Sequence, residues 1–151
     1  MWIIILYFLI MKILIIKEAG GASNFDCFLG VLSKKLSHAI CKKLYAYSEL
    51  DELYSCNRLK ILNPKIWGYS GVIYKLRVDC KKESVRILFV KTESNNLVML
   101  HGFIKKTRKT PNKEAKVAIH KFNQLGVGEN LRPLNLNKYF LIHDDVKNVS
   151  I

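Results

Sequence analysis

Two arginines and a pair of lysines are the residues of this chain best suited to do chemistry. Arg77 and Arg86 lie in neighbouring apolar stretches, and Lys105 and Lys106 follow a third in the run LHGFIKKTRKTP (100–111). A guanidinium matches phosphate oxygens in a planar fork, and a lysine crowded by cations has a lowered pKa and can act as a base. Together these side chains could hold a phosphate and stabilise the charge on a phosphorus under attack.

RNA cleavage fits such a set because RNA carries its own nucleophile. The 2′-hydroxyl loses a proton, attacks the adjacent phosphate and expels the 5′-oxygen, so the protein supplies proton transfer and electrostatic stabilisation. Only one of the two lysines is expected to enter the site, because consecutive residues of an extended backbone point to opposite faces. Lys105 shares its face with His101 and Phe103. Lys106 shares its face with Ile104.

Other familiar kinds of site are missing from the sequence. It contains no G-x-x-x-x-G-K-[ST] phosphate loop, no G-x-S-x-G nucleophile elbow and no H-E-x-x-H zinc motif. The four cysteines lack a C-x-x-C spacing. The four histidines are scattered, which is typical of structural or solvated histidines: His38, His101, His120 and His143. We therefore expect neither a metal site nor a cofactor.

The chain as a whole is strongly basic. Its 151 residues include 25 Lys and Arg against 12 Asp and Glu, which gives a formal net charge of +13. Such an excess favours an anionic partner, with nucleic acid ahead of an anionic membrane surface. Half of the residues are hydrophobic (50%), which is enough to build the core of one domain.

The N-terminal stretch MWIIILYFLIMKILIIKE is apolar but interrupted by Lys12. A membrane-spanning helix needs roughly 20 consecutive apolar residues, and a signal peptide needs a charged start. We therefore expect Met11 to be the natural start, with residues 1–10 as an extension, and we expect a cytoplasmic protein. A membrane anchor is the alternative.

Hydrophobic spacing predicts the elements of the first half of the chain. The segment 12–18 is short and rich in β-branched residues, which predicts a strand. Apolar residues then recur at helical spacing from 25 to 47, with lysines between them, which predicts an amphipathic helical region broken near Gly30. Residues 63–71 contain Asn-Pro and two glycines and read as a loop.

The second half predicts three strands and a helix. The strands are expected at 72–78, 85–91 and 97–103. A helix follows, with Thr110 as N-cap and Pro111 in its first position, and it ends near residue 126. The order indicates a small α+β domain with helices packed on one face of an antiparallel sheet.

The first of these strands shows which face carries the cations. Its apolar residues alternate and form one face, which leaves Lys75 and Arg77 on the other. If the strands pair, Arg77, Arg86 and the lysines at 105 and 106 could converge on one face or edge of the sheet. Plainer readings stay open: a solvated basic loop, or an ion pair of Arg86 with Glu93 or Asp79. From the residues alone, the chain is a basic α+β nucleic-acid-binding domain.

Four segments resemble the HigB-type, phage-derived branch of the RelE/ParE toxin superfamily. That branch carries the series Y-x-L-R … R-[IV]-[LF] … L-H-x-F-x-K-K-T-x-K-T-P-x-x-E. The matching segments are IYKLRVD (73–79), VRILFV (85–90), VMLHGFIKKTRKTP (98–111) and the E-x-x-x-A at 114–118. The resemblance implies a RelE-like fold over residues 11–126, with about four strands, N-terminal helices on one face and a C-terminal helix. Residues 127–151 would be a divergent tail.

The resemblance also implies a function and partners. It implies the toxin of a type II toxin–antitoxin module, acting as a metal-independent mRNA endonuclease, often on the ribosome, that arrests translation. The partners implied are mRNA and an antitoxin, commonly a helix-turn-helix protein. Two alternatives stay open: a ParE-like toxin that acts on a protein such as gyrase, and a degenerate, inactive copy. The tail motivates the second, because neither Tyr139 nor His143 aligns with a catalytic residue of the family.

The resemblance assigns roles residue by residue. Arg77 and Arg86 match the strand arginines and are expected to bind the phosphate and stabilise the transition state. Lys105 and Lys106 match the double lysine, and we assign proton transfer to Lys105. Four further residues are expected to contact RNA: Lys75, Phe103, Arg108 and Lys109. Phe103 is alternatively a core residue, and Arg108 and Lys109 are alternatively solvated.

Overall fold

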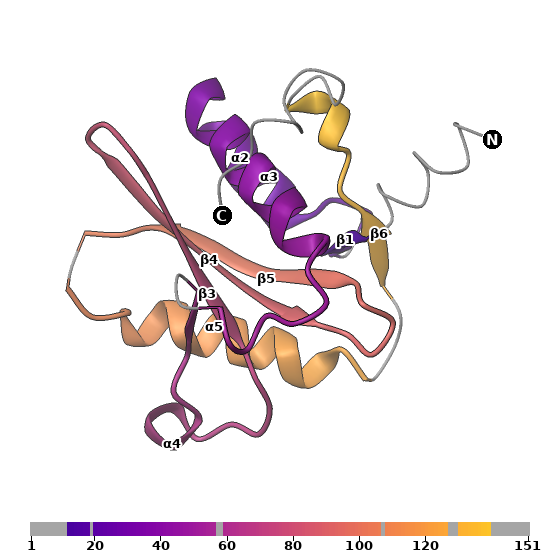
Figure 1. Ribbon diagram of the computed structural model, residues 1–151, viewed down its shortest axis with the longest axis vertical. Helices are drawn as coiled ribbons and strands as arrows, with labels where there is room; N and C mark the ends of the chain where they lie inside the picture. Colours follow the sequence, from indigo (N-terminus) through magenta and orange to yellow (C-terminus); the bar gives the residue numbers. More distant parts are fainter. Residues whose placement is uncertain (1–11, 19, 57–58, 107, 127–129, 140–151) are drawn as a thin grey trace.

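The computed structural model describes residues 12–18, 20–56, 59–106, 108–126 and 130–139. They form a six-stranded sheet of order β2-β3-β4-β5-β1-β6, with helices on both of its faces (Figure 1). The strands are β1 (Ile13–Ile16), β2 (Lys60–Ile61), β3 (Tyr74–Cys80), β4 (Glu83–Lys91), β5 (Leu97–Ile104) and β6 (Leu131–Pro133). The helices are α2 (Asn24–Val31), α3 (Lys34–Ser48), α4 (Pro64–Trp67) and α5 (Asn112–Gln124), with a short 3₁₀ helix, η1, at Leu136–Lys138.

The predicted N-terminal helical region is two helices, α2 and α3. Ser33 begins α3 by accepting a hydrogen bond from the Leu36 amide at 3.2 Å, the usual use of serine as an N-cap. Leu36, Ile40 and Leu44 then recur at helical spacing and are fully buried. This face of α3 packs on the sheet and holds the first half of the chain in place.

The three central strands follow the predicted ones closely and pair in antiparallel order, β3 with β4 and β4 with β5. In β3, Tyr74, Leu76 and Val78 are buried, as their alternation predicts. The β4 strand is buried on both faces over most of its length. The sequence therefore positions the strands that carry Arg77 and Arg86 as expected.

Two hydrophobic clusters lie on opposite faces of the sheet. The first joins α2 and α3 to one face and includes Leu44 and Phe89. The second joins α5 to the other face and includes Leu88 and Ala118. The prediction that all helices pack on one face is therefore wrong, since α5 covers the face opposite α2 and α3 (Figure 1). The continuous apolar run of β4 is the sequence sign of this second layer, because a strand needs apolar residues on both faces when helices cover both.

The α+β class is confirmed, but the expected number of about four strands is too low, and the sheet is not purely antiparallel. β2 has two residues and β6 has three, too few for a period-two pattern to show. β1 pairs in parallel with β5 and in antiparallel order with β6. Residues 130–139, within the segment expected as a divergent tail, thus carry β6 and the fully buried Leu134 and Leu136.

The start of α5 also differs from the prediction. Its N-cap is Pro111, which has no side-chain capping bond. The Thr110 hydroxyl instead accepts a hydrogen bond from Lys75 Nζ at 3.3 Å, so the predicted threonine cap is wrong because its side chain is bound to β3. The extension 1–10, a strand considered near Leu141, and His143 lie outside the described residues.

Candidate functional site

The register of the sheet brings the two predicted arginines together. Arg77 of β3 lies directly opposite Arg86 of β4, and Arg86 lies opposite Phe103 of β5. Opposed residues of antiparallel strands share a face. The apolar residues between them fill the face under α3, so both arginines lie on the face that α5 partly covers.

Arg86 is held in one orientation. Its side chain is 8% exposed, and Nη1 donates to Ser84 Oγ and to the Val85 carbonyl oxygen, each at 2.9 Å. The same nitrogen lies 3.8 Å from Asp79 Oδ1. Burial lowers the pKa of Arg86, and the neighbouring Arg77 lowers it further, but arginine stays charged in proteins. The result is a fixed, partly desolvated guanidinium, of the kind that binds phosphate strongly.

One carboxylate lies between the two arginines. Arg77 Nε donates to Asp79 Oδ2 at 2.6 Å, and Ser84 Oγ donates to Asp79 Oδ1 at 2.5 Å. The Ser84 bond is the largest influence that lowers the pKa of Asp79; burial opposes it and Arg77 adds to it. Asp79 therefore stays ionised and cannot neutralise both arginines. Arg77 itself is 68% exposed, which leaves it accessible to a ligand.

Lys105 joins the arginines from β5. Its amide donates to the Ser84 carbonyl at 2.8 Å, which extends the strand pairing one step beyond Ile104. Lys105 therefore shares its face with Phe103 and Arg86, as the parity of the sequence predicts. Burial, then Arg86 and Arg77, lower the pKa of Lys105. A lysine with a lowered pKa is a candidate proton acceptor.

Lys75 completes the group on β3. Burial lowers the pKa of Lys75 the most, and the positive charges of Lys105 and Arg86 lower it further. Its Nζ donates to Thr110 just ahead of α5, which ties β3 to the β5–α5 connection. We refer to Lys75, Arg77, Arg86 and Lys105 as the cationic cluster. Four basic side chains from β3, β4 and the end of β5 lie on this face, and Asp79 pairs with the two arginines among them.

The other predicted cations lie outside this cluster. Lys106 is exposed and makes no hydrogen bond or ion pair with another described residue. Arg108 and Lys109 are also exposed, in the segment that leads to α5. Their contacts with RNA, and a catalytic role for Lys106, stay predictions.

Phe103 and its neighbours form a support for the cluster. Phe103 is 6% exposed and belongs to the hydrophobic cluster under α5, so the core alternative describes its position. Its ring stacks on His101 at a centroid distance of 6.0 Å, and His101 Nε2 pairs with Glu114 in the first turn of α5. Sequence reasoning missed this pair and the role of Ser84. The i, i+2 spacing of Ser84 and Arg86 could have revealed the latter, because it places both on one face.

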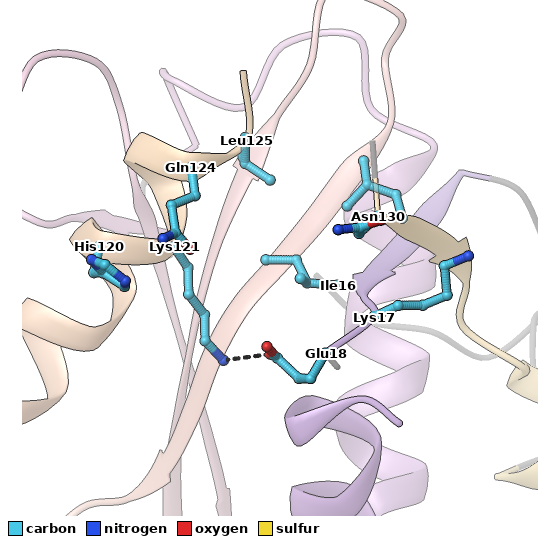
Figure 2. Close-up of a pocket in the computed structure, with 9 residues that line it drawn as sticks. Ile16, Lys17, Glu18, His120, Lys121, Gln124, Leu125 and Asn130 are labelled. Carbon is cyan, nitrogen blue, oxygen red and sulfur yellow. Dashed lines mark ion pairs between the residues drawn. The ribbon is translucent and has the colours of Figure 1, made fainter. Parts of the chain in front are cut away.

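The cavity drawn in Figure 2 lies at the opposite end of α5 from the cluster. It measures about 300 Å³. Figure 2 shows Lys121 of α5 extending across it toward Glu18, with Nζ and Oε1 3.3 Å apart. The charges of this pair cancel, and no residue of the cationic cluster lines the cavity. The ion pair links α5 to the residues that follow β1.

The described part of the chain contains neither of two further kinds of site. No group of three or more His, Cys, Asp and Glu side chains there could hold a metal ion. No helix in the same ranges is both long enough and apolar enough to cross a membrane.

Comparison with known proteins gives the family. The model of the family "Phage derived protein Gp49-like (DUF891)" matches residues 32–123. The chain belongs to the Gp49-like family. This family is part of the RelE/HigB-like toxin group. No curated protein matches the chain.

The Gp49-like match runs from the end of α2 through nearly all of α5. It therefore contains every residue of the cationic cluster, together with Asp79 and Ser84. The extension, β1 and β6 lie outside it. The part of the chain shared with the family is thus the part that builds the candidate site.

Proposed function

We propose that this Gp49-like protein is the toxin of a type II toxin–antitoxin module and that it cleaves mRNA. The observation that carries the proposal is the cationic cluster, where four basic side chains share one sheet face around a single bonded carboxylate. The surplus of positive charge suits a phosphate group. The family's place in the RelE/HigB-like toxin group supports the toxin role, and the series between residues 73 and 118 supports the HigB-type branch.

In this mechanism the arginines bind the phosphate that is attacked. Arg86 is fixed by Ser84 and the Val85 carbonyl, so it needs no reorganisation as charge builds on the phosphorus. Preorganised donors of this kind are worth roughly 10²–10³ in rate when they stabilise a developing oxyanion. Arg77 is exposed beside it and contributes a second guanidinium that a ligand can reach.

The lysines move the protons. Lys105, whose pKa is lowered by burial and by Arg86, accepts the proton of the 2′-hydroxyl. The oxygen then attacks phosphorus, the bond to the 5′-oxygen breaks, and a 2′,3′-cyclic phosphate forms. We assign Lys75 to protonate the departing 5′-oxygen, because it lies on the same face and its charge interacts with both Lys105 and Arg86. Side chains handle every proton in this scheme, so cleavage is independent of metal ions.

The proposal includes partners. An antitoxin is expected from the toxin-like family, and we propose a helix-turn-helix protein encoded beside the toxin gene. mRNA is the proposed substrate, engaged on the ribosome. The strong positive charge of the chain suits both contacts, since ribosomal RNA and mRNA are polyanions.

Induction in bacteria followed by mapping of mRNA 5′ ends tests the proposal. We expect wild type to arrest growth and create new 5′ ends within coding regions, and we expect Arg86→Ala to abolish both. Growth arrest with intact mRNA would contradict the nuclease and support action on a protein target. A folded wild-type protein that causes neither arrest nor cleavage would identify an inactive copy.

A further inference from the structure

We propose that a groove beside the cationic cluster binds a nucleobase of the RNA strand whose phosphate the cluster holds. This inference rests on the proposed RNA substrate and adds a binding site to it. The groove lies between α4 and the segment that leads into α5, and it has a volume of about 510 Å³. Its basic residues were expected to contact RNA, but neither the family match nor the motif series assigns a role to its α4 side.

One wall of the groove is apolar and aromatic. Ile61, Ile66 and Trp67 line it, and Ile66 is 72% exposed. Ile66 and the neighbouring, partly exposed indole of Trp67 therefore give this wall an apolar surface that is open to a ligand. Aromatic side chains bind bases of single strands by stacking, whatever the base.

The α4 segment that carries this wall is well fixed. Asn63 Oδ1 accepts a hydrogen bond from the Lys65 amide at 2.9 Å, and Gly68 ends the helix with a positive φ of 67°. The Tyr69 hydroxyl then bridges the base of the segment, donating to the Leu62 carbonyl at 2.5 Å and accepting from the Ile73 amide at 3.1 Å. The groove therefore exists before any ligand arrives.

The opposite wall is basic and continuous with the cluster. Arg108, Lys109 and Lys75 line it, and Lys75 is itself a member of the cationic cluster. No acidic side chain is among the described residues that line the groove. A strand with one phosphate on the cluster would thus meet further cations and an aromatic surface together, which is the combination that binds single-stranded nucleic acid.

Trp67 offers a direct optical test. The chain has two tryptophans, Trp2 and Trp67, so Trp2→Phe leaves Trp67 as the fluorescent reporter. The probe is an eight-nucleotide 2′-O-methyl oligoadenylate, which lacks the nucleophile and cannot be cut. We expect saturable quenching of Trp67. We expect Trp67→Leu to weaken binding by about 5- to 100-fold, and Trp67→Phe to retain most of the affinity.

The matched variants separate this inference from the nuclease proposal. Leucine retains the apolar contact of residue 67 with the core under α5, and a thermal melt confirms that the variant is folded. Three results would overturn the proposal that the groove binds a base. The labelled oligonucleotide could bind wild type without changing Trp67 fluorescence, it could bind Trp67→Leu with wild-type affinity, or it could fail to bind wild type. Mapping of mRNA 5′ ends tests the nuclease proposal independently of these binding measurements. If Trp67→Leu loses affinity for the antitoxin but not for the oligonucleotide, the groove binds protein and the inference is wrong.

Discussion

Two carboxylates in this protein each interact with one hydroxyl and two cationic side chains. One of them connects distant parts of the chain, whereas the other connects neighbouring residues of one hairpin. Asp26 of α2 accepts a hydrogen bond from the Tyr139 hydroxyl at 2.5 Å and from Arg132 Nη2 at 3.2 Å, with Lys138 Nζ 3.6 Å away. All three partners lie at least 106 positions after Asp26 in the sequence. We call these four residues the Asp26 cluster.

Asp79 has similar partners but a local role. Its hydroxyl donor Ser84 and its arginines all come from the β3–β4 hairpin, two to seven positions away (77, 84 and 86 against 79). Its side chain is 41% exposed, against 15% for Asp26. Lys75 and Lys105 lie next to this group and add two further positive charges.

The same arrangement of charges thus serves two purposes in this protein. A group with a mostly buried carboxylate that joins segments distant in sequence stabilises the fold, because breaking it separates those segments. A group within one hairpin whose carboxylate is 41% exposed and which has a surplus of positive charge adds less to stability and leaves cations available to bind a phosphate. Changes in the cationic cluster should therefore affect cleavage, and changes in the Asp26 cluster should affect folding.

The largest expected effect is on the lysine pair. Lys105→Ala should lower the rate of RNA cutting by about 100-fold or more, the usual loss for a general base. The matched control is Lys106→Ala, which should cut within about threefold of wild type because this side chain is exposed and outside the cluster. Rates are compared on a labelled RNA with purified protein. Equal losses in both variants would contradict the assignment of Lys105.

The pH dependence of cutting sharpens this assignment. Lys105 must be neutral to accept a proton, and its pKa lies below the ordinary 10.5 because of burial and the nearby arginines. The rate of wild type should therefore rise about tenfold per pH unit below that pKa, and it should fall again at higher pH, where Lys75 loses the proton that it donates to the 5′-oxygen. Lys105→Ala should lose this rise. A pH-independent wild-type rate would show that another group moves the proton.

The Asp26 cluster should respond in stability instead. Tyr139→Phe removes the hydroxyl that donates to a nearly buried carboxylate, and hydrogen bonds to charged groups contribute about 1.5–3 kcal/mol. We expect a loss of this size in the free energy of unfolding, measured by urea titration, with unchanged cutting by the folded protein. Full stability in Tyr139→Phe would remove the distinction between the two clusters.

Acid should weaken the same cluster. Burial would raise the pKa of Asp26, but the hydrogen bonds from Tyr139 and Arg132 outweigh it and hold the pKa below the ordinary 3.8. The unfolded chain therefore binds a proton first as pH falls. The contribution of Asp26 is complete above about pH 4 and is lost as pH drops through its folded pKa. In urea titrations at a series of pH values across this range, the free energy of unfolding of Asp26→Asn should fall less with decreasing pH than that of wild type. An equal fall in both proteins would contradict the assignment.

The smallest effect is expected at Ser84. Ser84→Ala removes a donor to Asp79 and an acceptor for Arg86, but Asp79 is exposed, so the loss of stability should be below about 1 kcal/mol. Cutting should fall several-fold, because Arg86 loses one of its two short hydrogen bonds. A stability loss as large as that of Tyr139→Phe would show that the hairpin group is structural.

The sequence predicted the shared face of Arg77, Arg86 and Lys105 better than it predicted their surroundings, although Lys75 was not among the side chains expected to converge there. Alternation in β3 and the parity of Lys105 placed the cations on one face, because side-chain direction in a strand is a local property. Sequence reasoning missed the second helical layer, the parallel pairing of β1 and the Asp26 cluster. These depend on contacts between distant segments, and strands as short as β2 and β6 carry no period. α4 was read as a loop, so the groove beside Trp67 was not foreseen.

One pair of variants tests the central claim most directly. Arg86→Met and Arg132→Met each replace an arginine with an unbranched apolar side chain, one in each cluster. We predict that Arg86→Met stays folded and cuts RNA about 10²–10³-fold more slowly, whereas Arg132→Met cuts at the wild-type rate and melts at a lower temperature. Wild-type cutting by a folded Arg86→Met protein would contradict the account.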